Sequence, residues 1–402
     1  MQSKTAVRMP NTPFLKLIVK SGLLAPDDLI SVLSHYDPAE VEAVDPIHLA
    51  TFLVRKKLLT KYQAMQLLSG RSGGFLLGRY KILEGIRQDR VGMLFLGESK
   101  DSGQKVSVKV IPTERISDKA AFENFLEEIR LAASINHSSV AQIFDIGELT
   151  GTHYVVSELV TAPTLDSIIA QHGPIAPKAA IMIVAQVAVG LQKAHSIGLF
   201  HRDLKPGNIA LLPDMRIKLL DLGLTNLMDD PWKQNTKRIS QEEYALEITH
   251  IPPEQGLDQE FDCRSDLYSL GSTLYYLLTG KPAFPGLAID SMAARQTQDI
   301  PPPSLIQDGI PSQVDQLIAK LGARDRNQRL PSAADLIAMV YPWVPAEEWT
   351  ALGVPAPRPI QKQPVRRVSG AKRVHEEKAA SDVQEKAAGN RLFASIRRFF
   401  GR

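Results

Sequence analysis

The stretch HRDLKPGN, residues 201–208, constrains this chain more than any other, together with a second aspartate that follows it in DLG. It places Asp203 two residues before Lys205, and a carboxylate beside a lysine can orient a hydroxyl group and offset negative charge. Asn208 and Asp221 offer oxygen ligands to a hard dication such as Mg²⁺. These groups suit phosphoryl transfer, because positioning and charge stabilisation carry that catalysis.

Hydrophobic alternation predicts several strands from Tyr80 onward. YKILEGI, VGMLFLGES and QKVSVKVI read as three strands, with Lys109 near the end of the third. An amphipathic helix that carries Glu128 follows, and AQIFDIGELTGTHYVVSELV supplies two further strands. The next segment, PKAAIMIVAQVAVGLQKAHSIGLF, reads as a long helix that is apolar on most faces and therefore buried.

These segments resemble the eukaryotic-like (Hanks-type) serine/threonine protein kinases. The resemblance rests on HRDLKPGN, DLG, VSVK and PPEQ, and it covers about Tyr80 to Tyr341. It implies an α+β, bilobal protein-kinase fold with a small β-rich N-lobe and a mainly helical C-lobe. The chain then divides into a helical N-terminal module at 1–75, a kinase domain at 80–344 and a tail at 345–402.

The resemblance also implies a function, the transfer of the ATP γ-phosphate to serine and threonine hydroxyls of protein substrates, with Mg²⁺ as cofactor. Asp203 would orient the substrate hydroxyl and Lys205 would stabilise the transferring phosphoryl group. Lysine two residues after the aspartate is the serine/threonine form of this loop. Asn208 and Asp221 would bind Mg²⁺.

The resemblance assigns the nucleotide contacts to the strand-rich part. Lys109 would hold the α- and β-phosphates, and Glu128, nine residues before His137, would steady that lysine. Glu158 and Val160 are the candidates for backbone contacts with adenine, and Gly92 and Leu94 are further candidates for nucleotide contacts.

The glycine-rich loop of the family departs from its pattern here. The family has G-x-G-x-x-G, whose glycines let the backbone approach the phosphates. Arg87, Asp89 and Gly92 occupy the three glycine positions in this chain, and Glu247 stands where a threonine is expected before PPEQ. A pseudokinase or weakly active signalling scaffold is therefore the alternative to an active kinase. The presence of Lys109 and the other catalytic positions favours the active enzyme.

Residues 14–33 and 49–68 form a repeat at an offset of 35 residues. Each copy reads as a helix, a turn and a second helix, with Thr60 as a plausible cap in the second copy. The module would either dock partners or stabilise the domain that follows, and the sequence leaves both open. The pattern LLTKYQAMQLLSGR resembles that of kinases from planctomycete-type bacteria.

The polar stretch before PPEQ corresponds to the family's activation segment, with Thr236 and Ser240 as candidate phosphate acceptors. The alternative is that they are ordinary loop hydroxyls. Arg202 is the type of residue that pairs with a phosphorylated loop. Glu254 is expected to form a buried ion pair with Arg329, and Asp266 to brace the catalytic loop.

Composition and charge indicate a cytoplasmic protein. The single cysteine allows no intrachain disulfide, and no uncharged apolar run reaches the roughly 18 residues of a membrane span. The N-terminus has too short an apolar core for a signal peptide. The chain carries a net charge of only +3, so its basic charge belongs to residues 357–402, with twelve Lys and Arg against four Asp and Glu.

The last residues, NRLFASIRRFFGR, place phenylalanines on one helical face and arginines on the other. This pattern is typical of a helix that lies on a membrane surface or binds a partner, and it also occurs without a function. The body has no aromatic-basic platform, so we expect no nucleic-acid partner.

Overall fold

The computed structural model describes residues 12–33, 45–88, 92–111, 119–224, 248–255 and 260–355. These divide into two compact units. The first contains the described residues up to 162 together with 193–203 and 218–224, and the second contains 163–192, 204–217 and the described residues from 248 onward.

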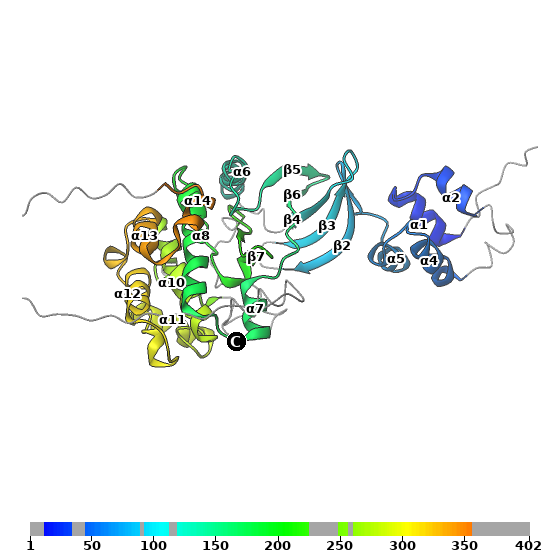
Figure 1. Ribbon diagram of the computed structural model, residues 1–402. Coiled ribbons are helices and arrows are strands. Elements are labelled where there is room, and N and C mark those ends of the chain that lie inside the picture. The colour runs from blue at the N-terminus through cyan, green and yellow to red at the C-terminus, as the bar shows by residue number, and fades with distance from the viewer. Residues whose placement is uncertain are drawn as a thin grey trace, which may run out of the picture. The chain divides into compact units, whose positions relative to one another are not determined.

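The N-terminal module consists of helices with a shared core (Figure 1). They are α1 (Pro13–Ser21), α2 (Pro26–Leu33), α4 (Pro46–Arg55) and α5 (Lys61–Leu68). Thr12 and Asp45 accept hydrogen bonds at the starts of α1 and α4, and each helix then opens with a proline, which suits its first turn. Leu15, Ile18, Leu29, Leu53 and Leu67 are almost completely buried in one cluster drawn from both copies of the repeat.

Helix α5 fastens this module to the sheet through hydrogen bonds to backbone carbonyls. Gln63 is fully buried, and its Nε2 donates to Ile82 O at 2.6 Å. Thr60 Oγ1 donates to Leu83 O at 2.5 Å, and Thr60 and Gln63 also form a capping box. The ring of Tyr62 packs edge-on against Phe95 of the sheet.

The sheet of the first unit has the order β1-β2-β3-β4-β6-β5, with antiparallel neighbours throughout (Figure 1). Its strands are β1 (Leu76–Leu77), β2 (Tyr80–Gln88), β3 (Met93–Ser99), β4 (Lys105–Ile111), β5 (Ile143–Leu149) and β6 (Thr152–Glu158). The sheet is curled, so that β2 approaches β5: Tyr80 Oη and Arg79 Nη2 both donate to Asp145 Oδ2 at 2.9 Å. Helix α6 (Lys119–Ala133) packs against β5 and buries Phe125 and Ile129.

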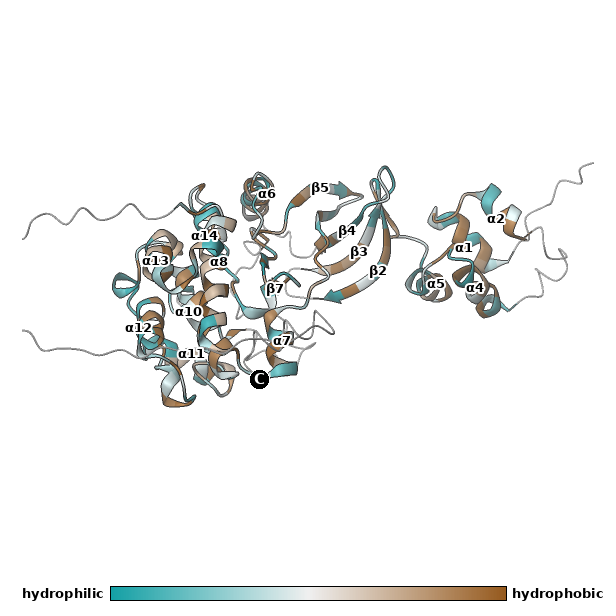
Figure 2. Cartoon of the chain, viewed as in Figure 1, coloured by the Kyte–Doolittle hydropathy of each residue, from teal (hydrophilic) through white to brown (hydrophobic). Residues whose placement is uncertain are grey.

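The second unit is mainly helical. Its helices are α7 (Leu165–His172), α8 (Pro177–His195), α10 (Cys263–Thr279), α11 (Ala288–Thr297), α12 (Ser312–Leu321), α13 (Ala333–Val340) and α14 (Ala346–Ala351). The last residues of α8, from Lys193, belong to the first unit. Figure 2 shows hydrophobic residues along α8 and α10, both of which are largely buried. A Cβ at Gly271 of α10 would lie 2.7 Å from Leu321 Cβ, so this glycine permits the close packing of α10 and α12.

Short strands and turns complete the fold. Strands β7 (Ile209–Leu211) and β8 (Ile217–Leu219) form a separate two-stranded sheet, and 3₁₀ turns lie at η2 (Pro206–Asn208), η5 (Pro303–Leu305), η6 (Arg326–Gln328) and η7 (Tyr341–Trp343). Across the described ranges, no helix combines the length and the apolar character that a membrane crossing requires.

Candidate active site

Strand β4 holds Lys109 at the centre of the sheet. Lys109 lies opposite Leu94 of β3 and Val155 of β6, and only 3% of its side chain is exposed. A buried ammonium group needs an anionic partner, because desolvation without one is costly. That partner is Asp221 of DLG, whose Oδ2 accepts from Lys109 Nζ at 2.9 Å. The structure therefore brings together Lys109, predicted to bind phosphates, and Asp221, predicted to bind Mg²⁺.

Asp221 carries a negative charge that its neighbours stabilise. Burial by itself would raise the pKa of this carboxyl, but the charges of Lys109 and Arg87 and the hydrogen bond from Lys109 outweigh it and hold the pKa below its usual value. The charge of Asp203 acts in the opposite direction. Asp221 also has a left-handed backbone, with φ of 58°, a strained conformation that often marks functional sites.

Arg87 approaches the same carboxylate oxygen from the end of β2. Its Nη2 lies 3.5 Å from Asp221 Oδ2, and 38% of its side chain is exposed. The pairing of β2 with β3 is irregular between Gly85 and Arg87, and Arg87 faces Leu94 across the sheet. The residue that replaces the first glycine of the family's loop thus lies at the site.

Glu128 pairs with Arg202 and not with Lys109, which differs from the predicted Lys109–Glu128 pair. Glu128 Oε1 accepts from Arg202 Nη2 at 3.2 Å, and Glu128 Oε2 is buried without a hydrogen-bond partner in the described part of the chain. Burial raises the pKa of Glu128, and the charge of Arg202 only partly offsets it. The physical reason is that Asp221 pairs with Lys109 here, while Arg202 is the cation within reach of Glu128. The family role of Glu128 stays a prediction.

The remaining nucleotide candidates lie on the same sheet or at its edge. Glu158 ends β6, where its backbone N–H donates to Gln142 O at 2.8 Å and its carboxylate accepts from Lys218 Nζ at 2.7 Å. Val160 lies two residues further on and is half-buried. A Cβ at Gly92 would lie 2.0 Å from Val110 O, so a glycine is required there for strand packing whether or not a nucleotide binds.

The catalytic-loop residues divide between the two units. Asp203 belongs to the first unit, whereas Lys205 and Asn208 belong to the second. Asn208 ends the η2 turn, is 97% buried, and donates its N–H to Lys205 O at 2.9 Å. The turn is tight against α7, because a Cβ at Gly207 would lie 3.0 Å from Asp166 Oδ2.

Asp221 is an ionised carboxylate, which is the kind of donor that Mg²⁺ takes together with substrate phosphates and waters. The amide oxygen of Asn208, the second donor that the kinase resemblance implies, is also of a type that Mg²⁺ accepts. The described ranges contain no cluster of three or more His, Cys, Asp or Glu that would suggest an all-protein metal cage.

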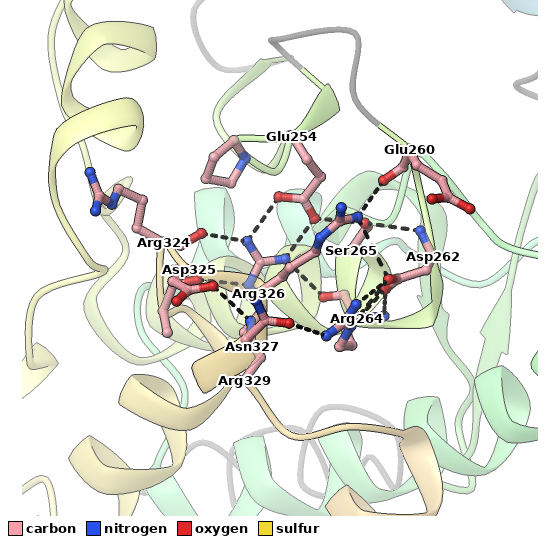
Figure 3. Close-up of polar contacts among 12 residues, drawn as sticks. Glu254, Glu260, Asp262, Arg264, Ser265, Arg324, Asp325, Arg326, Asn327 and Arg329 are labelled. Carbon is pink, nitrogen blue, oxygen red and sulfur yellow. Dashed lines mark hydrogen bonds and ion pairs between the residues drawn. The ribbon is translucent and has the colours of Figure 1, made fainter.

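A buried ion pair braces the second unit, and it confirms the predicted pairing of Glu254 with Arg329 (Figure 3). Arg329 Nη1 and Nη2 donate to the two carboxylate oxygens at 2.6 and 2.8 Å, and Ser265 Oγ donates to Glu254 Oε1 at 2.6 Å. Burial would raise the pKa of Glu254, but the hydrogen bonds and charge of Arg329 hold it below the usual value. The pair fixes the position of PPEQ.

Arg295 of α11 is a supporting residue that sequence reasoning missed. Its Nη1 donates to Ile248 O and to Ile251 O, both at 2.7 Å, and thereby holds the segment just before PPEQ. Next to it, Gln296 Nε2 donates to Pro253 O at 2.8 Å. An arginine on an amphipathic helix normally reads as solvated, so the sequence gives no signal for this role.

Some of the predictions fall on residues that the structure leaves undescribed. Asp89, Thr236, Ser240 and Glu247 lie outside the described residues, as does the tail from 356 to 402.

The chain is similar in sequence to known proteins of one family. A family model described as "Protein kinase domain" matches residues 80–343. The chain is 32% identical over 310 residues to serine/threonine-protein kinase PknA of Mycobacterium tuberculosis, with 76% of this chain and 68% of PknA covered. It is 31% identical over 268 residues to PknB of that organism, with 65% of this chain and 42% of PknB covered.

Solved structures agree on the fold. The crystal structure of the Mycobacterium tuberculosis PknI kinase domain matches with a TM-score of 0.53 at 21% identity, covering 67% of this chain and 98% of the PknI chain. The chain therefore belongs to the protein kinase family, with a β-sheet N-lobe and a helical C-lobe. It is a serine/threonine protein kinase of the bacterial Hanks type, and the comparisons favour an active enzyme over a pseudokinase.

Proposed function

We propose that this chain binds ATP with Mg²⁺ and phosphorylates serine and threonine residues of protein substrates through the residues of HRDLKPGN and DLG. The observation that carries the proposal is the ion pair of the buried Lys109 with Asp221, 2.9 Å apart, in a chain that also has Asp203 and Asn208 in the family's catalytic loop. A lysine and an ionised aspartate held together are the phosphate-binding and metal-binding groups of the family's site.

Each residue has a distinct part in the reaction. Asp203 accepts a hydrogen bond from the substrate hydroxyl and takes its proton as the new P–O bond forms and the bond from the γ-phosphorus to the β,γ-bridging oxygen breaks. Lys205 and Lys109 offset the negative charge of the phosphoryl groups, and Asn208 and Asp221 would hold Mg²⁺. When bound, the metal neutralises the charge that develops on the phosphate oxygens.

The test is phosphate incorporation by the purified chain with ATP and Mg²⁺, into itself and into a protein substrate. Asp203→Asn removes the base and keeps the shape, so we expect incorporation to fall by about 10²- to 10⁴-fold. Asp308→Asn makes the same change at an exposed position of the second unit and should leave the rate unchanged. Equal rates for Asp203→Asn and the wild type would contradict the assignment of the base.

We also propose that the chain is planctomycete-like and cytoplasmic. The similarity of LLTKYQAMQLLSGR to kinases of that group supports the first, and the single cysteine and the lack of a long apolar run support the second. Finding the same hairpin repeat ahead of the sheet in kinases of that group would test the lineage. Cell fractionation would test the location, and recovery of the chain outside the cell would contradict it.

The N-terminal module is proposed to bind a docking partner in addition to stabilising the sheet. Apolar side chains on it that are largely exposed support the first role: Ile47 and Met65 are 61% and 68% exposed. The hydrogen bonds of Thr60 and Gln63 support the second. Ile47→Ser together with Met65→Ser would keep the fold and weaken docking of a substrate, measured as a raised KM with unchanged kcat; an unchanged KM would remove the docking role.

For the tail we propose peripheral contact with a membrane surface.

A further inference from the structure

Arg87 is the residue of this site that the family's pattern does not explain. It replaces the first glycine of the glycine-rich loop, yet its guanidinium group extends into the site and lies 3.5 Å from Asp221 Oδ2. Lys109 Nζ lies 2.9 Å from the same oxygen. Two cations therefore share one carboxylate oxygen, and these three side chains together carry a net charge of +1.

The two cations are held very differently. Only 3% of the Lys109 side chain is exposed, whereas 38% of the Arg87 side chain is exposed. The longer distance and the greater exposure make the Arg87–Asp221 pair the weaker one, since ion pairs that contact solvent contribute little. Arg87 can therefore leave Asp221 when a better anion arrives, while Lys109 stays in place.

A nucleotide triphosphate is such an anion. The family's glycines serve phosphate binding by letting the backbone come close, and a side chain at the first of these positions takes that approach away. A guanidinium group has five N–H donors in a planar fork that matches phosphate oxygens. Arg87 thus has the chemistry to replace the lost backbone contacts with side-chain contacts.

We propose that Arg87 binds the phosphates of the nucleotide and exchanges its contact with Asp221 for them. The inference rests on the proposed function, because it requires that a nucleotide binds beside Lys109. It also has a consequence that the usual glycine-rich loop would not have. Arg87 adds one cation to Lys109, so this site should hold metal-free ATP more tightly than it would without Arg87, since Arg87 balances part of the charge that Mg²⁺ would neutralise.

The experiment measures the dissociation constant of ATP for the full chain, by calorimetry, once with excess EDTA and once with Mg²⁺. In EDTA, we expect Arg87→Gln to weaken ATP binding by about 10- to 100-fold, the range for a lost hydrogen bond to a charged group. With Mg²⁺ the loss should be smaller, because the metal supplies positive charge in the variant. Arg87→Lys keeps the charge without the fork and should fall between wild type and Arg87→Gln in EDTA.

The matched control is Arg130→Gln, which removes the same charge from an exposed position of α6 and should change neither constant. Equal loss in Arg130→Gln would attribute the effect to net charge and overturn the proposal. So would an Arg87→Gln variant that binds metal-free ATP as tightly as the wild type, or more tightly, since Arg87 would then be inert or obstructive. A wild type that binds ATP in neither condition would instead reject the proposed function, and this inference with it.

Discussion

Two ion pairs in this structure decide what the site can do. Lys109 forms an ion pair with Asp221, and Glu128 forms one with Arg202. In an active protein kinase the lysine of the third strand pairs with the glutamate of the following helix. Glu128 has a raised pKa and a buried Oε2 that accepts no hydrogen bond from the described residues, and both make its present position unfavourable for a carboxylate. We therefore expect Glu128 to exchange Arg202 for Lys109 when the enzyme works.

The variant Glu128→Gln tests this exchange. It should lower kcat/KM by about 10- to 100-fold, because a charged hydrogen bond to Lys109 is lost in the working enzyme. The free energy of unfolding at neutral pH should change by no more than about 1 kcal/mol. The folded-state pKa is raised, so the ionised carboxylate costs stability above the ordinary pKa, and its removal offsets the lost Arg202 pair.

Glu127→Gln is the control for this variant, because Glu127 is the exposed neighbour on the same helix and carries the same charge. Steady-state kinetics and urea denaturation of both variants give the two quantities. If Glu128→Gln keeps full activity and loses several kcal/mol of stability, Glu128 serves only to hold Arg202.

The sequence identifies candidate site residues but not the partners that the structure gives them. HRDLKPGN, DLG and Lys109 are recognisable because their types and order are specific. The partner of Lys109 could not be predicted from the residues, since Asp221 lies 112 positions away and competes with Glu128 for the same cation. Arg295 was missed for a related reason: its backbone partners are 44 and 47 positions away and carry no sequence pattern.

At the scale of elements, periodicity predicted the five main strands, the helix that carries Glu128 and the helices of the N-terminal module. Their apolar positions recur at the period of a strand or of a helix. The two-residue strand β1 was not predicted, since it is too short to show a period. The attachment of α5 to β2 was not predicted either. A glutamine on a short helix reads as a solvent-facing residue, yet Gln63 is fully buried against backbone carbonyls.

Gln63→Ala is the test of that attachment. The variant leaves Ile82 O and the N–H of Thr60 without their side-chain partners, and an unsatisfied buried group costs about 1–3 kcal/mol. We expect urea denaturation to show a loss of about 2 kcal/mol, and hydrogen exchange to show faster exchange of the β2 amides. Gln66→Ala, on the same helix, removes only an exposed contact with Arg71 and should cost less than about 0.5 kcal/mol. Equal losses in the two variants would show that Gln63 acts only through helix propensity.

At the scale of the whole molecule, the charge is divided along the chain. Residues 357–402 have a surplus of positive charge, whereas the whole chain is only +3, so the remainder is net negative. A body of that sign is repelled by an anionic membrane, while the tail is attracted to it. We therefore expect any membrane contact to come from the tail, whose apolar residues are concentrated in NRLFASIRRFFGR.

Co-sedimentation with vesicles tests whether the tail contacts a membrane, using the full chain and a variant that ends at Asn390. The removed segment contains Arg391, Arg397, Arg398 and Arg402 beside its phenylalanines. At about 1 kcal/mol for each basic residue near an anionic surface, the four arginines favour anionic over neutral vesicles by roughly 10³-fold. We expect the full chain to sediment with anionic vesicles and to be released by high salt, because screening weakens this attraction, and the shortened chain to stay in solution. A full chain that stays in solution with both kinds of vesicle would leave partner binding, or no function, as the role of this segment.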